Sequence, residues 1–320
     1  MINLDDIRQA HARVQPIAHR TPVLTSRSFN ERAGVQAYFK CENFQRGGAF
    51  KIRGAANFVY SIPKQDLTRG VVAFSSGNHA QAVAIAAASV GTPATIIMPT
   101  DAPQSKVQAT RGYGAKIITY DRMKEDREVL GRQVAAETGA TLVPPYDHVR
   151  TITGQGTVAL ELLEQTPSLD ALVICAGGGG LLAGCSIAAK ALHPEIRIFG
   201  VEPEDGNDTF LSFQRHERVE IHPPTTSADG LRAQKPGALT FPIVQKNVES
   251  MFLVSEDEIW HTMAFCLSRM KMLVEPSGAV AAAAVLSGKL PAGLQRVGIV
   301  VSGGNVDLDL LARFQDAQFR

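Results

Sequence analysis

Short apolar runs rich in β-branched residues alternate with alanine-rich stretches along most of the chain. Continuous apolar runs of this kind are typical of strands in a parallel sheet whose two faces are both covered by helices. The pattern therefore predicts an α/β protein with doubly wound parallel sheets. The predicted strands are 70–74, 94–99, 115–120, 170–176, 196–203 and 296–304.

Several strand–helix units follow one another through short loops in the first half of the chain. We expect them to form a small substrate-binding domain over residues 70–146. Pro144 and Pro145 break the pattern where the chain would leave this domain. Residues 1–69 and 147–320 would then form a larger, cofactor-binding domain.

Composition and charge exclude several classes of protein. The 320 residues are 45% hydrophobic and 20% charged, and the formal net charge is +1. This balance gives no general reason to expect nucleic acid or an anionic membrane as a partner. No apolar run approaches the roughly 20 residues of a membrane helix, and the N-terminus lacks the apolar core of a signal peptide. Cysteines form no C-x-x-C pair, so neither a zinc knuckle nor a redox dithiol is indicated. We expect a cytoplasmic protein.

Four consecutive glycines, Gly177, Gly178, Gly179 and Gly180, follow one predicted strand and open a helix. The free N–H groups and the dipole of a helix N-terminus suit a phosphate group. The same stretch fits the dinucleotide fingerprint G-x-G-x-x-A, and Glu202 stands near the expected position of a ribose-binding acid. From this stretch alone, a nicotinamide enzyme and another phosphate-binding enzyme both stay open.

The stretch "SSGNHAQ" places Ser75, Ser76, Asn78 and His79 at a second strand–helix turn. Its free backbone N–H groups suit a carboxylate, whereas a simple helix cap would need only one such polar residue.

In "GGAFKIRGAANF", Lys51 lies between apolar residues at the start of a predicted helix. Burial and the helix dipole can lower the pKa of such a lysine, and a neutral amine can react with an aldehyde. A surface lysine is the commoner alternative. A phosphate loop, a reactive amine and a carboxylate-binding turn together favour pyridoxal phosphate (PLP) as cofactor. A dinucleotide enzyme would need neither Lys51 nor the second anion-binding turn.

On these residues, the sequence resembles the fold-type II PLP enzymes of the serine/threonine dehydratase and serine racemase family. The resemblance implies a tryptophan synthase β-like fold with the cofactor between two domains. It looks most like the bacterial members that act on threo-3-hydroxyaspartate. The matching stretches are "FKIRGA" (50–55), "SSGNHAQ" (75–81), "GQGT" (154–157), "GGGGLLAG" (177–184), "VEP" (201–203), "ADGL" (228–231), "VEPSGA" (274–279) and "VSGGNVDL" (301–308).

The resemblance implies a role for each matching position. Lys51 would bind the cofactor aldehyde and remove the α-proton, and Ser76 would be the acid/base on the opposite face in a racemase. The cofactor would further contact Phe50 at its ring, Asn78 at its 3-hydroxyl, Ser302 at its pyridine nitrogen, and Gly177, Gly178, Gly179, Gly180 and Leu181 at its phosphate.

The resemblance also implies how the substrate and a cation would bind. Ser75, Ser76, Asn78 and His79 would surround the substrate carboxylate. Glu202, Gly206 and Asp208 would supply oxygen ligands to a divalent cation, Mg²⁺ or Ca²⁺. The alternative for this last stretch is a polar loop after a strand.

The expected activity is elimination of water from a β-hydroxy amino acid, giving a 2-oxo acid and ammonia. Serine, threonine and threo-3-hydroxyaspartate all fit, and His148, Arg150 and Arg232 are candidates for binding a second carboxylate. One alternative is a serine or aspartate racemase with Lys51 and Ser76 as opposed bases. More remote alternatives are a nicotinamide-linked oxidoreductase and a non-enzymatic PLP-binding or amino-acid-sensing module. The resemblance also implies a homodimer.

Overall fold

The computed structural model describes residues 2–102, 104–121, 123–312 and 314 of the chain. Its strands are β1 (Val23–Leu24), β2 (Gln36–Cys41), β3 (Val71–Phe74), β4 (Ala94–Pro99), β5 (Lys116–Tyr120), β6 (Thr141–Leu142), β7 (Ala171–Cys175), β8 (Arg197–Pro203), β9 (Ser250–Val254) and β10 (Arg296–Val301).

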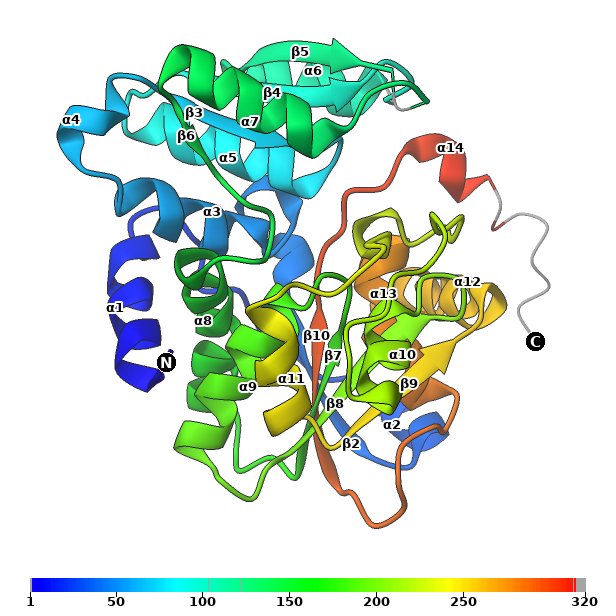
Figure 1. Ribbon diagram of the computed structural model, residues 1–320. Helices are drawn as coiled ribbons and strands as arrows, with labels where there is room; N and C mark the ends of the chain where they lie inside the picture. Colours follow the sequence, from blue (N-terminus) through cyan, green and yellow to red (C-terminus); the bar gives the residue numbers. More distant parts are fainter. Residues whose placement is uncertain (1, 103, 122, 313, 315–320) are drawn as a thin grey trace.

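Helices connect and cover these strands (Figure 1). The α-helices are α1 (Leu4–Val14), α2 (Arg27–Ala33), α3 (Lys51–Tyr60), α4 (Lys64–Leu67), α5 (Asn78–Ser89), α6 (Gln104–Gly112), α7 (Arg127–Thr138), α8 (Val149–Gln165), α9 (Gly180–Leu192), α10 (Asp208–Arg215), α11 (Thr240–Asn247), α12 (Glu256–Phe265), α13 (Pro276–Leu286) and α14 (Leu308–Leu311). Shorter turns are the 3₁₀ helices η1 (Glu42–Phe44), η2 (Arg46–Gly48) and η3 (Asp229–Leu231) and the π-helix η4 (Cys266–Met270). No helix among the described residues has the length and apolarity to cross a membrane.

The strands form two sheets, with the orders β1-β2-β10-β7-β8-β9 and β5-β4-β3-β6. Within the described residues every strand pair is parallel except β1 with β2. The predicted α/β class with two parallel-sheet domains is therefore confirmed. Each predicted strand is present, but β10 ends at Val301 and not at residue 304. The chain leaves the sheet there because Gly303 forms an isolated bridge with Ala49.

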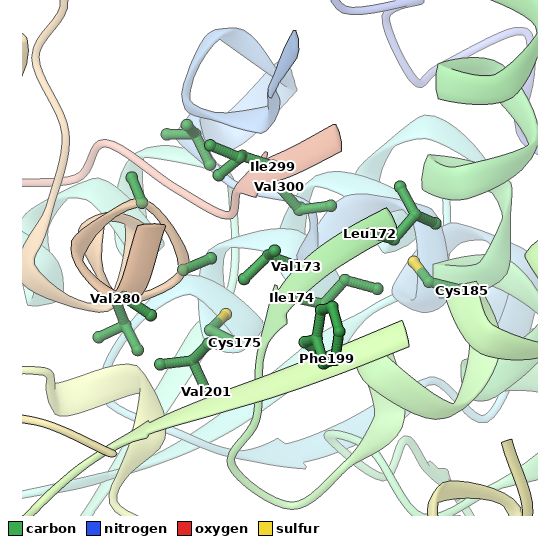
Figure 2. Packing of buried hydrophobic residues seen from close by; sticks show 14 of the residues in the cluster. Leu172, Val173, Ile174, Cys175, Cys185, Phe199, Val201, Val280, Ile299 and Val300 are labelled. Atoms are coloured by element: carbon green, nitrogen blue, oxygen red, sulfur yellow. The ribbon is translucent and has the colours of Figure 1, made fainter. Parts of the chain in front are cut away.

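The six-stranded sheet and its helices form the larger layer, and the four-stranded sheet and its helices form the smaller layer. The hydrophobic core of the larger layer lies on both faces of its sheet. Successive side chains of a strand point to opposite faces, and β7 shows this alternation. Val173 lies on the side of α13 with Val280, whereas Leu172 lies on the side of α9 with Cys185 (Figure 2). All of β7 is buried. This two-sided burial explains why the strand reads as an unbroken apolar run.

The four-stranded sheet also has two covered faces. Val71 and Ala73 of β3 belong to one hydrophobic cluster with α5, while Val72 and Phe74 belong to another with α7. Helix α3 lies between the two sheet layers (Figure 1), and its residue Ile52 packs in the cluster with Val71. The division at residues 69/70 and 146/147 stays a prediction.

Candidate active site

Lys51 is the first residue of helix α3, which lies between the two sheet layers (Figure 1). Its Nζ donates a hydrogen bond to the carbonyl of Pro145, at 3.0 Å, and lies 5.1 Å from the centroid of the Phe50 ring. Burial lowers the pKa of Lys51 to about 8. A substantial fraction of the amine is therefore neutral near physiological pH, as a nucleophile or base requires.

A buried ionic cluster holds the first turn of α3 in place. The Arg53 side chain is fully buried and binds the carboxylates of Glu42 and Glu161 at 2.8 Å. Lys40 is also fully buried and binds Glu161 at 2.7 Å. Two cations thus face two anions, and losing one partner would leave an uncompensated buried charge. The cluster lies two residues from Lys51, and nothing in the sequence pattern predicted it.

The end of β10 lies beside the approach to Lys51. The Phe50 N–H donates to the carbonyl of Ser302 at 3.0 Å. The Ser302 side chain is buried, and its hydroxyl donates to the carbonyl of Ser277 at 3.3 Å. Residues far apart in the sequence thus meet at this point, as the predicted contacts of Phe50 and Ser302 with one cofactor require.

Asn78 is held from both ends of its side-chain amide. Its Nδ2 donates to Glu275 Oε1 at 2.7 Å, and its Oδ1 accepts from Asn305 Nδ2 at 2.8 Å. The Asn305 backbone N–H also donates to Glu275 Oε2 at 3.1 Å. Burial, followed by the charge of Asp229, raises the pKa of Glu275 to about 8. Glu275 and Asn305 were not predicted as site residues, although both lie in stretches that carry the family resemblance.

The Ser/Asn turn precedes α5, which packs against α3, and the charge of Lys51 acts on His79 of this turn. The Gly77 N–H donates to Ser75 Oγ at 3.2 Å, whereas Ser76 Oγ has no hydrogen-bond partner in the described part of the chain. His79 is buried, and its Nε2 lies 2.9 Å from the carbonyl of Val143. Burial, with the charge of Lys51, lowers the pKa of His79 to about 3. The neutral ring donates through Nε2, so any contact of His79 with the substrate carboxylate would come from its backbone N–H.

The glycine loop has no room for side chains. Gly179 has φ 89°, in the left-handed region, and a Cβ there would lie 2.8 Å from Thr240 Oγ1. A Cβ at Gly180 would lie 2.9 Å from Tyr146 Cβ, and one at Gly178 would overlap the Tyr146 ring. The Thr240 hydroxyl donates a hydrogen bond to the Gly178 carbonyl at 2.7 Å. With its carbonyl side occupied, the loop presents the N–H groups that open α9, including that of Leu181.

Two carboxylates lie buried directly behind this loop. Glu202 ends β8 and Asp208 begins α10, and both side chains are fully buried. Glu202 Oε2 accepts from the Phe210 N–H at 2.7 Å, but Glu202 Oε1 and both Asp208 oxygens have no hydrogen-bond partner among the described residues. Burial and the charge of Asp208 raise the pKa of Glu202, and burial raises that of Asp208 to about 8. The neighbouring Thr209 hydroxyl donates to the Gly177 carbonyl at 2.8 Å, which joins the pair to the loop.

The three residues considered for a second substrate carboxylate each contact neighbouring residues. His148 Nδ1 accepts from the Arg150 N–H at 3.0 Å, and its ring packs on Phe58 at 4.7 Å between centroids. The Arg150 guanidinium lies 5.4 Å from the centroid of the same ring. Arg232 donates through Nε to the carbonyl of Thr226 at 2.8 Å. Binding of a second substrate carboxylate by any of the three stays a prediction.

The family follows from comparison with known proteins. A family model described as "Pyridoxal-phosphate dependent enzyme" matches residues 14–303. The chain belongs to this family. It is 52% identical to L-threo-3-hydroxyaspartate ammonia-lyase of Saccharomyces cerevisiae over 303 residues, which are 95% of this chain and 93% of that protein. It is 46% identical to serine racemase of Schizosaccharomyces pombe over 310 residues, covering 97% of this chain and 96% of that protein. The solved structure of maize serine racemase matches with a TM-score of 0.94 and 44% identity, covering 98% of this chain and 97% of that one.

The residues present fit PLP as the cofactor of this family member. Lys51 offers an amine of lowered pKa, and the glycine loop offers backbone donors at a helix N-terminus. The nicotinamide alternative required Glu202 to bind a ribose, yet its carboxylate is fully buried and accepts from Phe210. The predicted cofactor is therefore confirmed, and the role of each residue toward it stays a prediction.

The lowered pKa of Lys51 predicts how the apoenzyme takes up its cofactor. Only the neutral amine attacks the aldehyde, so the rate constant for uptake should rise about tenfold per pH unit well below the pKa. It should level off above pH about 8. Stopped-flow absorbance on apoenzyme mixed with PLP measures this, with N-α-acetyllysine as the control, whose rate continues to rise toward about pH 10.4. A protein profile that follows the control would contradict the buried, perturbed amine.

Proposed function

We propose that this PLP enzyme is an ammonia-lyase that eliminates water from L-threo-3-hydroxyaspartate, giving oxaloacetate and ammonia. The observation that carries the proposal is the buried Lys51 amine at the junction, beside a carboxylate-binding turn. The 52% identity to a lyase named for this substrate supports the choice among β-hydroxy amino acids. Serine and threonine are the other substrates of the same chemistry.

The chain's own residues account for the proton transfers and the binding. PLP bound at this site would supply an electron sink for the charge left at Cα when its proton is removed. Lys51 would remove that proton, because its lowered pKa keeps part of the amine neutral. The turn of Ser75, Ser76 and Asn78 would hold the α-carboxylate through backbone N–H groups at the start of α5. The β-hydroxyl leaves as water, and water taken up again on hydrolysis of the imine product releases ammonia.

An ammonia-release assay tests the proposal. Purified holoenzyme is given L-serine, L-threonine and each isomer of 3-hydroxyaspartate, with and without Mg²⁺. We expect the highest kcat/KM with the L-threo isomer and equimolar formation of oxaloacetate. Ammonia release from serine or threonine alone would overturn the substrate, and no release from any of them would overturn the lyase.

Racemisation is the second candidate function, and one observation favours it. Ser76 Oγ makes no hydrogen bond to the described residues and is therefore free to exchange a proton with a substrate. Serine racemase of S. pombe is 46% identical to this chain. The two activities share a cofactor and Lys51, so one protein can carry out both.

We also propose a divalent cation at Glu202, Gly206 and Asp208. Three buried carboxylate oxygens without partners in the described part of the chain are a costly arrangement unless a cation or protons compensate them. Among the described residues no group of three or more His, Cys, Asp or Glu side chains could hold a metal ion. The ion would therefore rely on two carboxylates, the Gly206 carbonyl and water, an oxygen set that suits Mg²⁺ or Ca²⁺.

Removing this cation should destabilise the protein. EDTA is expected to lower the melting temperature by about 5 °C, and excess Mg²⁺ should restore it, because an ion that binds only the folded state stabilises it. Asp208→Asn should abolish the response in differential scanning calorimetry. Glu204→Gln is the matched control, since Glu204 lies in the same loop but is exposed. An undiminished response in Asp208→Asn would place the ion elsewhere.

Three further expectations stay predictions from the sequence. They are a homodimer, a cytoplasmic location, and the domain bounds of 1–69 with 147–320 around 70–146. The strand composition of the two sheets supports the domain bounds, because every strand of the smaller sheet lies between residues 71 and 142.

A further inference from the structure

An ion pair joins the two sheet layers near the candidate active site. Lys106 lies on α6, which packs against α5 and β5, and Asp229 begins η3 in the larger layer. The Lys106 amine donates a hydrogen bond to the Asp229 carboxylate. The Lys106 side chain is only 16% exposed, and that of Asp229 is 41% exposed. A lysine so little exposed needs its anionic partner, so the pair favours contact between the layers.

On the side of Asp229, η3 contacts the proposed cofactor loop. A Cβ added to Gly177 would lie 3.3 Å from the Cα of Leu231. A Cβ added to Gly206 would lie 3.3 Å from the Leu231 carbonyl oxygen. The Gly230 N–H donates to Ser277 Oγ at 2.9 Å, near the start of α13. Asp229 is therefore attached to a turn that touches the phosphate-binding loop, the proposed cation loop and α13.

On the side of Lys106, α6 contacts the helix that carries the Ser/Asn turn. Val107, the next residue, is buried in one hydrophobic cluster with Ala80 and Val83 of α5. Helix α5 begins at Asn78, directly after the turn. A displacement of Lys106 would therefore be transmitted through packed side chains to the turn that binds the substrate carboxylate.

The charges of Lys106 and Asp229 act on Glu275, which accepts a hydrogen bond from Asn78. Burial lowers the pKa of Lys106, but the charge of Asp229 and the hydrogen bond with it outweigh this effect and leave the pKa raised. Lys106 thus stays protonated. Asp229 raises and Lys106 lowers the pKa of Glu275, which accepts the hydrogen bond of Asn78. The pair is therefore within electrostatic range of the active-site network.

We infer that Lys106 and Asp229 are positioning residues whose ion pair fixes the carboxylate-binding turn relative to the phosphate-binding glycine loop. The inference rests on the proposed function for its substrate. The substrate would bind the smaller layer through its carboxylate and the larger layer through the cofactor. It reacts only when the two layers are correctly positioned relative to each other. Small misplacements of reacting groups lower rates strongly. Neither residue needs to touch the reacting atoms.

Single neutral variants and a charge swap test this role. Lys106→Met and Asp229→Asn should each lower kcat/KM for L-threo-3-hydroxyaspartate about tenfold, with the absorbance of bound PLP unchanged. The double variant Lys106→Asp with Asp229→Lys should return to within about threefold of wild type, because it restores the pair. Wild-type kcat/KM in the single variants, or a swap no better than they are, would overturn the inference. So would a lowered melting temperature with unchanged kcat/KM.

Lys124→Met is the matched control. Lys124 pairs with Asp121 at 3.1 Å within the smaller layer, and its side chain is 80% exposed. We expect no change in this variant. Because Asp229 is partly exposed, salt should also screen the Lys106 pair, so the ratio of wild-type to Lys106→Met activity should shrink from about 0.05 M to about 0.5 M NaCl. A ratio independent of salt would contradict an electrostatic role.

A second measurement separates this inference from the proposed function. If wild type releases no ammonia from any β-hydroxy amino acid, the proposed function fails. The positioning role is then measured by the rate at which hydroxylamine removes PLP from Lys51. We expect several-fold faster removal in Lys106→Met than in wild type or Lys124→Met, because the layers over the cofactor are less well fixed. Equal rates in all three proteins would overturn the positioning role whatever the substrate is.

Discussion

Replacing Lys51 with alanine is expected to lower ammonia release about 10⁴-fold or more and to abolish the visible absorbance of lysine-bound PLP. The variant loses both the amine that binds the aldehyde and the base that removes the α-proton. Among the described residues, the only hydrogen bond of this amine is to the Pro145 carbonyl, so the fold should be kept. Steady-state ammonia assays, absorbance spectra and melting curves on one preparation measure the three effects.

The design separates loss of chemistry from loss of fold. Lys64→Ala is the control, because Lys64 is an exposed lysine at the start of α4 and should change nothing. Methylamine added to Lys51→Ala should restore part of the activity, since a free amine can carry the missing proton. Full activity in Lys51→Ala would show that another lysine binds the cofactor, and the assignment of α3 as the catalytic helix would then be wrong.

Sequence patterning predicted β3, β4, β5, β7, β8 and β10 and missed β1, β2, β6 and β9. Strand β2 is an example, because Lys40 interrupts its apolar pattern. The structure buries that lysine completely and compensates it with Glu161, 121 positions later. Strand β2 also pairs with β10 at the far end of the chain. Neither the ion pair nor the strand pairing is visible in a local window of sequence.

Prediction of the candidate site from the sequence was limited in the same way, because a local window of sequence does not show tertiary contacts. Lys51, Asn78 and the glycine loop could be predicted, because each has a local signal at a helix start. Glu275 could not, since a lone glutamate in an apolar stretch shows neither its burial nor its contact with Asn78. Lys106 could not be predicted either, because its function depends on a partner in the other layer. Residues that act through tertiary contacts need the fold before they can be found.

Replacing Ser76 with alanine should separate the two activities of the site. Racemisation is expected to fall by about 10² to 10⁴, the usual contribution of one acid/base group, while elimination changes little. Elimination requires removal of the α-proton by Lys51 alone, whereas racemisation also requires a proton to be delivered on the opposite face. Chiral chromatography of recovered serine and aspartate, run beside the ammonia assay, measures both rates in one reaction.

Ser75→Ala is an informative comparison for this variant, because the two serines differ in their contacts. Ser75 Oγ accepts the Gly77 N–H at 3.2 Å and so supports the turn, whereas Ser76 Oγ is free of such bonds within the described residues. Loss of Ser75 should therefore weaken substrate binding and lower both activities together, while loss of Ser76 should change only their ratio. If Ser76→Ala lowered elimination as much as racemisation, Ser76 would be part of the carboxylate-binding turn and not the second base. A wild-type enzyme without racemisation, together with an unaffected Ser76→Ala variant, would leave Lys51 as the single base of a dedicated lyase.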